Sequence, residues 1–285
     1  MKIKVATTST SCLDYYSHNY DIDIIRIKIL IEDVEYLDGD TMKYEQFYQM
    51  FQKNPDFLPK TSQISVGEMV VYFKKLISQG YKKVFITTLS SVLSGTYNAI
   101  IQAQKMVADK IEVYCYDTQT VGFCEGYFSL QAYQLFQKGY SLKEVIEILD
   151  LIKNNNTIFF MTEKLTQLIK NGRLTGTKSF FGRLLGVKSI LQVQSTGKIA
   201  LIKKTLSTYK AFLFIVEKMK NYTQGQNYQA HLIFSGYPKL KDDFKKVLET
   251  KLGLKDLLEI PLTPVIGCHI GNSAVGIGII KKINS

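Results

Sequence analysis

The first half of the chain alternates short apolar runs with amphipathic helical patterns, and this alternation restricts the possible folds more than any other feature. Residues 3–7, 83–88 and 111–116 each have the pattern of a buried strand, and helical patterns lie between them. Strands that alternate with helices form βαβ units, which place parallel strands in one sheet with helices on its faces. The first half therefore predicts a three-layer α/β/α domain with a mainly parallel sheet.

One further strand is expected over residues 22–31. Within it Ile25, Ile27, Ile29 and Ile31 recur at every second position, as on the buried face of a half-buried strand. We expect a single continuous strand here.

A domain boundary is expected near residue 155. Ser141 and Glu144 have the spacing of a capping box, which predicts a helix running to about Lys153. The following Asn154-Asn155-Asn156 is typical of a linker. We therefore expect an N-terminal α/β domain over residues 1–155 and a C-terminal α/β domain over residues 156–285.

The pattern changes after this boundary. Strand patterns over residues 187–194 and 198–203 flank Ser195-Thr196-Gly197, which is a hairpin signal. Further expected elements are helices over residues 208–220 and 239–251 and a closing strand over residues 273–280. An antiparallel hairpin among helices and other strands predicts a mixed sheet in the second domain.

The composition is that of a globular protein, with 46% hydrophobic and 21% charged residues. The four cysteines are Cys12, Cys115, Cys124 and Cys268, which have neither C-x-x-C spacing nor the spacing of a zinc site. We interpret them as reduced, buried thiols. The N-terminus has no signal-peptide pattern, and no apolar run is long enough to span a bilayer. These features predict a cytoplasmic protein.

The net charge of +11 would allow binding to nucleic acid or to an anionic membrane. The lysines are, however, scattered along the chain as pairs, for example Lys74-Lys75 and Lys203-Lys204, and no nucleic-acid-binding motif accompanies them. We therefore expect no nucleic-acid partner.

Three polar segments lie where strands are expected to give way to loops or helices. They are residues 61–65, 90–96 and 265–271. Ser65 and Glu68 form a capping box, so Thr61 and Ser62 come just before a helix. Ser94 and Gly95 come just before another helix, at the same edge of the parallel sheet. The sequence thus predicts two helix N-termini that converge on one polar pocket.

The predicted pocket is rich in neutral hydrogen-bond donors. A buried carboxylate needs several hydrogen-bond donors in place of water. Thr61, Ser62, Ser94 and His269 supply hydroxyl and imidazole groups, and nearby backbone amides add to them. The glycines around His269, including Gly271, would let the backbone approach a ligand. We predict a carboxylate-binding site rather than a catalytic one.

Other roles for these residues are open at this level. The Ser and Thr residues could simply cap helices, and His269 could be a core histidine bonded to a backbone carbonyl. A Ser–His–acid triad is disfavoured because the sequence has no G-x-S-x-G motif. Arg173 follows a short helix that ends at Gly172, and it is either a donor to a phosphate or acidic partner or an ordinary surface arginine.

No cofactor is expected, because the glycines form neither a phosphate loop nor a dinucleotide fingerprint and no metal-ligand pattern is present. Apolar residues of the second domain are candidates for a tunnel that would hold an acyl chain, although most of them are expected in the core. These residues are Phe180, Phe181, Leu184, Leu185, Phe212, Phe214 and Ile215.

Taken together, the motifs resemble those of the DegV family of bacterial fatty-acid-binding proteins, over essentially the whole chain. The resemblance depends on the order and spacing of six segments. These are Thr7-Thr8-Ser9, Thr61-Ser62-Gln63-Ile64-Ser65, Ser91-Val92-Leu93-Ser94-Gly95-Thr96, Asp117-Thr118, Gly172-Arg173 and Gly267-Cys268-His269-Ile270-Gly271.

The resemblance implies two α/β domains and a non-catalytic lipid carrier. It places the carboxylate of a long-chain fatty acid between the domains, at Thr61, Ser62, Ser94 and His269, with the tail in the second domain. Some family members present the acid to an ATP-dependent fatty acid kinase, which makes acyl phosphate for phospholipid synthesis. Arg173 matches the arginine implicated in that partnership. A positive surface would favour transient contact with anionic membrane.

The chain departs from the family pattern at several positions. Thr8 stands in place of an acidic residue, Cys12 in place of an Asp, Ile64 in place of a proline and Ser273 in place of a glycine. None of these changes removes an expected head-group ligand. A second hypothesis comes from the fold shared with the substrate subunit of dihydroxyacetone kinase, which holds its substrate covalently on a histidine; it would require a small polar cavity.

Overall fold

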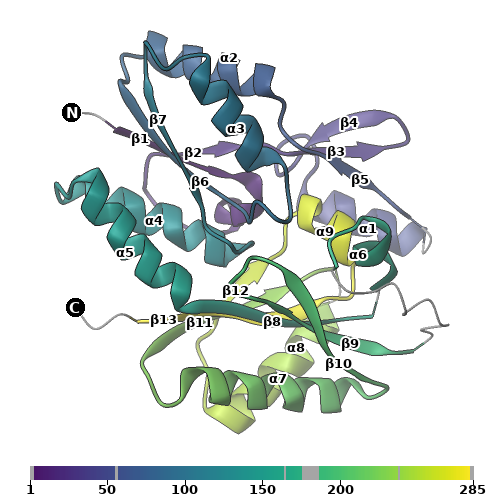
Figure 1. Ribbon diagram of the computed structural model, residues 1–285. Coiled ribbons are helices and arrows are strands. Elements are labelled where there is room, and N and C mark those ends of the chain that lie inside the picture. The colour runs from purple at the N-terminus through teal and green to yellow at the C-terminus, as the bar shows by residue number, and fades with distance from the viewer. Residues whose placement is uncertain (1–2, 55–56, 164, 175–185, 237, 283–285) are drawn as a thin grey trace.

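The computed structural model describes residues 3–54, 57–163, 165–174, 186–236 and 238–282. The chain forms a mixed α/β structure around three sheets (Figure 1). A parallel sheet of four strands belongs to the first half, a mixed sheet of six strands to the second, and a small antiparallel sheet lies beside them. This architecture confirms the predicted fold class.

The four-stranded sheet has the order β2-β1-β6-β7, and every neighbouring pair is parallel. Its strands are β1 (Ile3–Thr8), β2 (Ile22–Ile25), β6 (Lys83–Thr88) and β7 (Glu112–Asp117). The register pairs Thr7 with Thr87 and Thr88 with Asp117, so the strands end together in polar residues. This shared edge is where the predicted site should lie.

Helices cover both faces of this sheet (Figure 1). Those on one face are α2 (Val66–Ser78) and α3 (Thr96–Lys105), and those on the other are α4 (Phe123–Gln137) and α5 (Leu142–Asn154). Both predicted capping boxes are present, Ser65 with Glu68 at the start of α2 and Ser141 with Glu144 at the start of α5. The predicted three-layer arrangement is therefore confirmed.

The single strand expected over residues 22–31 is wrong. The chain leaves the parallel sheet after Ile25, which pairs with Thr8. It then enters the small antiparallel sheet, where Ile29 pairs with Tyr36 and Thr61. The small sheet consists of β3 (Lys28–Ile31), β4 (Val34–Leu37) and β5 (Lys60–Ser62), and α1 (Tyr44–Lys53) connects β4 to β5. The alternation of buried isoleucines continues across the break, so the pattern could not reveal it.

The six-stranded sheet has the order β10-β9-β8-β13-β11-β12, and only β11 and β12 pair in parallel among the pairs described. Its strands are β8 (Asn156–Thr162), β9 (Lys188–Val193), β10 (Ile199–Thr205), β11 (Tyr228–Phe234), β12 (Leu258–Pro261) and β13 (Val275–Lys281). The predicted hairpin joins β9 to β10, and Gly197 at its turn has a φ of 77°. The mixed sheet is as predicted.

The asparagine linker expected at residues 154–156 is wrong. Asn154 is the last residue of α5, and Asn156 is the first residue of β8. The side-chain amide of Asn156 donates hydrogen bonds to the carbonyls of Ile152 and Lys153, at 3.2 and 2.9 Å, and so caps the end of α5. Asparagine is used here to end a helix rather than to join domains flexibly.

Two helices, α7 (Thr208–Thr223) and α8 (Pro238–Leu252), pack on one face of the six-stranded sheet (Figure 1). Phe212 and Ile215 are buried in this layer with Phe244, whereas Phe214 is only partly buried against it. Phe212, Phe214 and Ile215, which were expected to line a tunnel, therefore do not line the cavity described below. The other four, Phe180, Phe181, Leu184 and Leu185, lie outside the described residues.

The opposite face of the six-stranded sheet joins the core of the first half. Buried Phe160 on β8 and Ile233 on β11 belong to the same apolar cluster as Phe85 on β6 and Phe128 on α4. The division at residue 155 separates the two large sheets along the chain, and as a domain boundary it stays a prediction.

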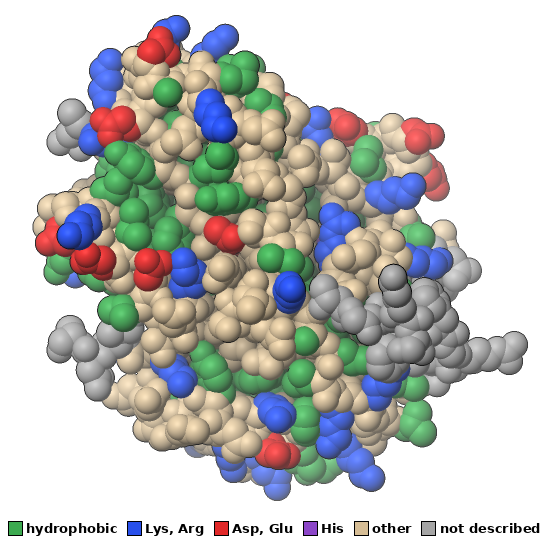
Figure 2. Space-filling model, in the orientation of Figure 1, with side chains coloured by type: hydrophobic (Ala, Val, Ile, Leu, Met, Phe, Trp, Pro, Cys, Tyr) green, Lys and Arg blue, Asp and Glu red, His purple; other side chains and the backbone are tan. Residues whose placement is uncertain are grey.

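None of the helices in the described part of the chain combines the length and apolar character needed to cross a membrane. Figure 2 shows lysine and arginine side chains dispersed over one face of the molecule, with several on the part where α7 lies.

Candidate functional site

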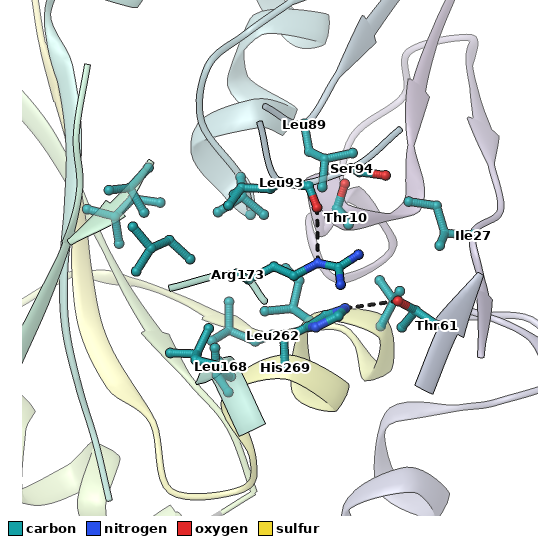
Figure 3. Close-up of a pocket in the computed structure, with 18 of the residues that line it drawn as sticks. Thr10, Ile27, Thr61, Leu89, Leu93, Ser94, Leu168, Arg173, Leu262 and His269 are labelled. Carbon is teal, nitrogen blue, oxygen red and sulfur yellow. Dashed lines mark hydrogen bonds between the residues drawn. The ribbon is translucent and has the colours of Figure 1, made fainter. Parts of the chain in front are cut away.

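A cavity lies between the parallel sheet and the inner face of the six-stranded sheet (Figure 3). Its empty volume is about 880 Å³, with the open mouth included. Polar side chains line one part, and apolar side chains line most of the rest. The polar members are Thr10, Thr61, Gln63, Ser94, Arg173 and His269, and the apolar members include Leu89, Ile158, Phe160, Leu168, Val193, Ile233 and Leu262.

Thr61 and His269 meet at the polar part of the cavity. Thr61 lies on β5, and His269 lies on the short helix α9 (Pro264–Ile270). Thr61 Oγ1 is 2.9 Å from His269 Nε2 (Figure 3). The two side chains form a hydrogen-bonded pair that faces the cavity.

The position of α9 depends on buried contacts behind it. Asp38, which is fully buried, accepts a hydrogen bond from the Val265 amide at 3.1 Å near the N-terminus of the helix. Gly267 packs against α1, because a Cβ atom there would lie 2.6 Å from both Phe47 Cε1 and Tyr48 Oη. Gly267 therefore serves the packing of two helices, and the role in ligand approach expected for the glycines around His269 stays a prediction.

Ser62 and Gly271 are not among the residues that line the cavity. Thr61 and Gln63 line the cavity and Ser62 does not. Ser62 follows Thr61 on β5, and consecutive residues of a strand point to opposite sides. The Ser62 hydroxyl donates to the Gln63 carbonyl at 3.4 Å. Gly271 ends α9 with a φ of 76°, and its amide donates to the Gly267 carbonyl at 2.8 Å. The role predicted for both residues stays a prediction.

Ser94 lies in the loop that leads into α3 and lines the cavity. Its hydroxyl is 3.0 Å from Thr96 Oγ1 and accepts a hydrogen bond from the Thr96 amide at 3.3 Å. Gly95 allows the side chain of Gln63 to pass over the loop, because a Cβ atom at Gly95 would lie 1.8 Å from Gln63 Oε1. The absence of a side chain at Gly95 therefore shapes the rim of the cavity.

Arg173 is half-buried and reaches the same cavity from the turn after α6 (Leu165–Lys170). Gly172, with a φ of 69°, ends that helix as the sequence predicted. The guanidinium donates to the Leu93 carbonyl through Nε at 3.3 Å and to the Asn171 carbonyl through Nη1. Within the described part of the chain no carboxylate forms an ion pair with Arg173. A positive charge thus faces the cavity without a counter-ion among the described residues.

Burial, with a further contribution from the Arg173 charge, lowers the pKa of His269 to about 4. The ring is therefore neutral at physiological pH and carries a single N–H. With that proton on Nε2 the ring donates to Thr61, and the Thr61 hydroxyl proton is then available to a ligand. His269 acts on a ligand through Thr61 in this arrangement.

Two polar lining residues, Thr10 and Gln63, were not predicted. Gln63 had a signal in the sequence, because it belongs to the polar segment over residues 61–65, and in the structure it comes directly after β5. Thr10 had none, since it follows β1 in the short 3₁₀ turn η1 (Ser9–Ser11) and only the tertiary structure brings it to the cavity. Within the described residues no cluster of His, Cys, Asp or Glu side chains could hold a metal ion.

Several solved structures share this fold over almost their full length. A DegV lipid-binding protein from Thermotoga maritima is 27% identical, with a TM-score of 0.87, and the match covers all of both chains. DegV from Bacillus subtilis, described as a fatty-acid-binding protein, is 28% identical, with a TM-score of 0.84 and coverage of 99% of this chain and 100% of that one.

Sequence comparison gives the same family. A DegV domain-containing protein from Listeria innocua is 30% identical over 282 residues, which cover 97% of each chain. The profile of the DegV family, whose description is "uncharacterised protein", matches residues 2–282. The chain belongs to the DegV family.

Proposed function

We propose that the protein binds one long-chain fatty acid, with the carboxylate at the polar part of the cavity and the tail along its apolar part. Arg173 supplies the charge, and Thr61 and Ser94 supply hydroxyl donors. The observation that carries the proposal is an arginine without a described counter-ion at one end of a cavity that is otherwise mostly apolar. Fatty-acid binding by the B. subtilis relative supports it.

The apolar lining accounts for the affinity that such a ligand would need. Each methylene group removed from water contributes about 0.8 kcal/mol, so a tail of fifteen carbons gives on the order of 10 kcal/mol before ordering costs. Leu89, Phe160 and Ile233 are buried residues that face this part of the cavity. A small polar ligand held covalently on a histidine fits these surroundings poorly.

We further propose that the protein is a non-catalytic carrier in the cytoplasm, which presents its acid to a fatty acid kinase. On this proposal residues 1–155 carry most of the head-group loops and residues 156–285 enclose most of the tail. The net charge of +11 favours brief contact with an anionic membrane, where the acid would be exchanged. Arg173, a half-buried residue that lines the cavity, is the proposed contact for the kinase.

Titration calorimetry of delipidated protein tests the binding proposal. Palmitic acid should bind in a 1:1 ratio, and hexadecanol, which has the same tail without the charge, should bind at least tenfold more weakly. Ser94→Ala should weaken palmitate binding, whereas Ser17→Ala, on an exposed loop, should not. Equal binding of the acid and the alcohol would contradict a carboxylate site. A covalent adduct with dihydroxyacetone, detected by intact mass, would favour the alternative.

A reconstituted reaction with a fatty acid kinase, ATP and the loaded protein tests the carrier proposal. Arg173→Ala should reduce acyl-phosphate formation at least tenfold under conditions where the variant is saturated with palmitate. Lys170→Ala, which removes an exposed positive charge three residues away, is the matched control. Unchanged phosphorylation with Arg173→Ala would overturn the assignment of Arg173.

A further inference from the structure

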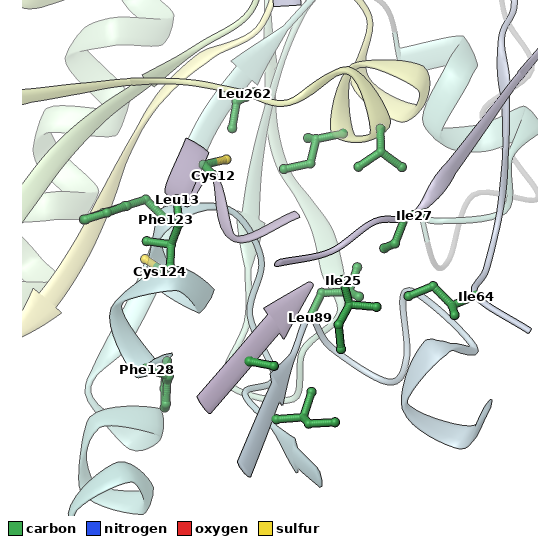
Figure 4. Close-up of a cluster of buried hydrophobic side chains, with 14 of the residues drawn as sticks. Cys12, Leu13, Ile25, Ile27, Ile64, Leu89, Phe123, Cys124, Phe128 and Leu262 are labelled. Atoms are coloured by element: carbon green, nitrogen blue, oxygen red, sulfur yellow. The ribbon is translucent and has the colours of Figure 1, made fainter. Parts of the chain in front are cut away.

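A carboxyl group is buried behind the polar part of the cavity. Glu125 lies in the first turn of α4 and has no exposed surface. Figure 4 shows apolar and thiol side chains around this end of the helix, among them Cys12, Leu13, Phe123 and Phe128. The helix approaches the η1 turn closely, because a Cβ atom at Gly126 would lie 2.5 Å from the Ser11 carbonyl oxygen.

Threonine hydroxyls surround this carboxyl group. Thr7 and Thr8 contact Oε1, the first at 3.4 Å, and Thr10 contacts Oε2 at 2.6 Å. Thr8 and Thr10 also contact each other, with 2.8 Å between their hydroxyl oxygens. No lysine or arginine of the described chain forms an ion pair with Glu125. Within the described chain, the partners of this carboxyl group are thus neutral donors.

Thr10 connects Glu125 to the cavity, since it touches the carboxyl group and also lines the site beside Ser94 (Figure 3). A hydroxyl group has one proton and two lone pairs. When Glu125 is ionised, the Thr10 proton goes to Oε2 and only lone pairs are left for the cavity. When Glu125 is protonated on Oε2, it donates to Thr10, and the Thr10 proton is free to reach a ligand.

Charge favours the second arrangement when an anion is bound. An ionised Glu125 and a ligand carboxylate would place two like charges near each other in a poorly solvated region, which is costly. Burial raises the pKa of Glu125 to about 8, although the hydrogen bonds from Thr10, Thr8 and Thr7 oppose the shift. Protonation of Glu125 from solvent therefore converts Thr10 from an acceptor into a donor toward the cavity.

We propose that Glu125 is a positioning residue of the carboxylate site. Protonated Glu125 lets Thr10 donate a hydrogen bond to the bound anion. The inference rests on the proposed function and names a residue outside the set of cavity-lining residues. Because of this hydrogen bond, protonation of Glu125 strengthens ligand binding, and ligand binding favours protonation of Glu125.

Other titratable groups face this region. Cys12 is one of them, and burial raises the pKa of its thiol well above the usual value. His231 packs edge-on against Phe123, and burial lowers the pKa of its ring to about 3. Tyr116 stacks near Phe128 and has a pKa raised by burial. Further charged groups on the elements packed against α4 are Lys4 on β1, Lys83 on β6, Lys143, Glu144, Glu147, Asp150 and Lys153 on α5, and Lys281 on β13. The cavity itself adds Arg173 and His269.

The test is the affinity of the delipidated protein for palmitic acid between pH 7.0 and 9.5. Wild-type affinity should fall at least tenfold over this range, because Glu125 must take up a proton for tight binding. Glu125→Gln should bind as well as wild type at pH 7.0 and show less than a threefold change with pH, because the amide donates to Thr10 at every pH. Each protein is measured under identical conditions, so changes in the state of free palmitate cancel in the comparison.

A second pair of variants tests Thr10 directly. Thr10→Val should bind palmitate about tenfold more weakly at pH 7.0, whereas Thr10→Ser, which keeps the hydroxyl, should bind within threefold of wild type. If Glu125→Gln does not fold, these two variants still test whether the Thr10 hydroxyl donates to the bound carboxylate. Equal affinities of the Thr10 variants, or the same pH profile for wild type and Glu125→Gln, would overturn the inference alone. Absence of palmitate binding to wild type would contradict the proposed function, and the inference with it.

Discussion

The imidazole Nε2 of His269 lies 2.9 Å from the hydroxyl oxygen of Thr61, and this contact joins segments 208 residues apart. One residue comes from an edge strand of the small sheet and the other from a seven-residue helix near the C-terminus. Because the ring is buried and neutral, it can hold the Thr61 hydroxyl with its proton toward the cavity. The pair therefore acts as one donor.

Thr61→Val and His269→Ala are each expected to weaken palmitate binding about tenfold, which corresponds to ~1.4 kcal/mol. The double variant should be little weaker than either single variant, because both changes remove the same donor. Calorimetry on the three variants measures the coupling. Additive losses, near a hundredfold in the double variant, would show that the two residues act independently.

Adjacent residues on β11 provide a matched pair for the tail. Ile233 lines the cavity, whereas Leu232 is buried in the layer formed with α7 and α8. Ile233→Phe should weaken binding of palmitate at least fivefold and affect octanoate less, because a larger side chain shortens the space for the tail. Leu232→Phe should lower stability by about 1–3 kcal/mol, as overpacked cores do, without changing affinity. Equal effects of the two changes on affinity would contradict this location of the tail.

Gly95 and Gln63 are predicted to depend on each other. Gly95→Ala would place a methyl group on the side chain of Gln63, which must then leave the rim of the cavity. We expect this variant to lose affinity for palmitate about three- to tenfold, and the further change Gln63→Ala to recover most of the loss. Affinity and thermal stability measured on the single and double variants check this. A double variant no better than Gly95→Ala would argue against the clash as the cause.

Local signals predicted much of the fold. The capping box at Ser65 and Glu68 placed the start of α2 correctly, because both halves of a capping box lie within four residues. The break between β2 and β3 could not be predicted in this way. Ile25 and Ile29 obey one alternating pattern, yet their partners, Thr8 and Thr61, are in different sheets.

Some residues of the site could be predicted from the sequence, and others could not. Thr61, Ser94 and His269 belong to polar segments at the ends of predicted elements, and the structure brings them to one cavity. Glu125 and Thr10 are 115 residues apart, and neither carries a local signal of its role. The acidic residue that the family pattern places at position 8 is a threonine here, and a carboxyl group reaches its hydroxyl from Glu125 instead.

Glu125 should also make stability depend on pH. The raised pKa of its carboxyl, about 8, means that the folded state holds a proton that the unfolded state releases near pH 4.5. The free energy of unfolding should therefore fall as pH rises from 6 to 8, by ~2 to 3 kcal/mol more in wild type than in Glu125→Gln. Urea unfolding at pH 6, 7 and 8 measures the difference. A gap between the two proteins that stays constant over this range would mean that Glu125 is ionised throughout.

Native mass spectrometry of freshly purified protein, followed by extraction and identification of released lipid, tests the central claim most directly. The account predicts one bound fatty acid per chain, retained in His18→Ala and present at lower occupancy in His269→Ala. A protein that carries no lipid and takes up none when long-chain fatty acids are added would contradict it.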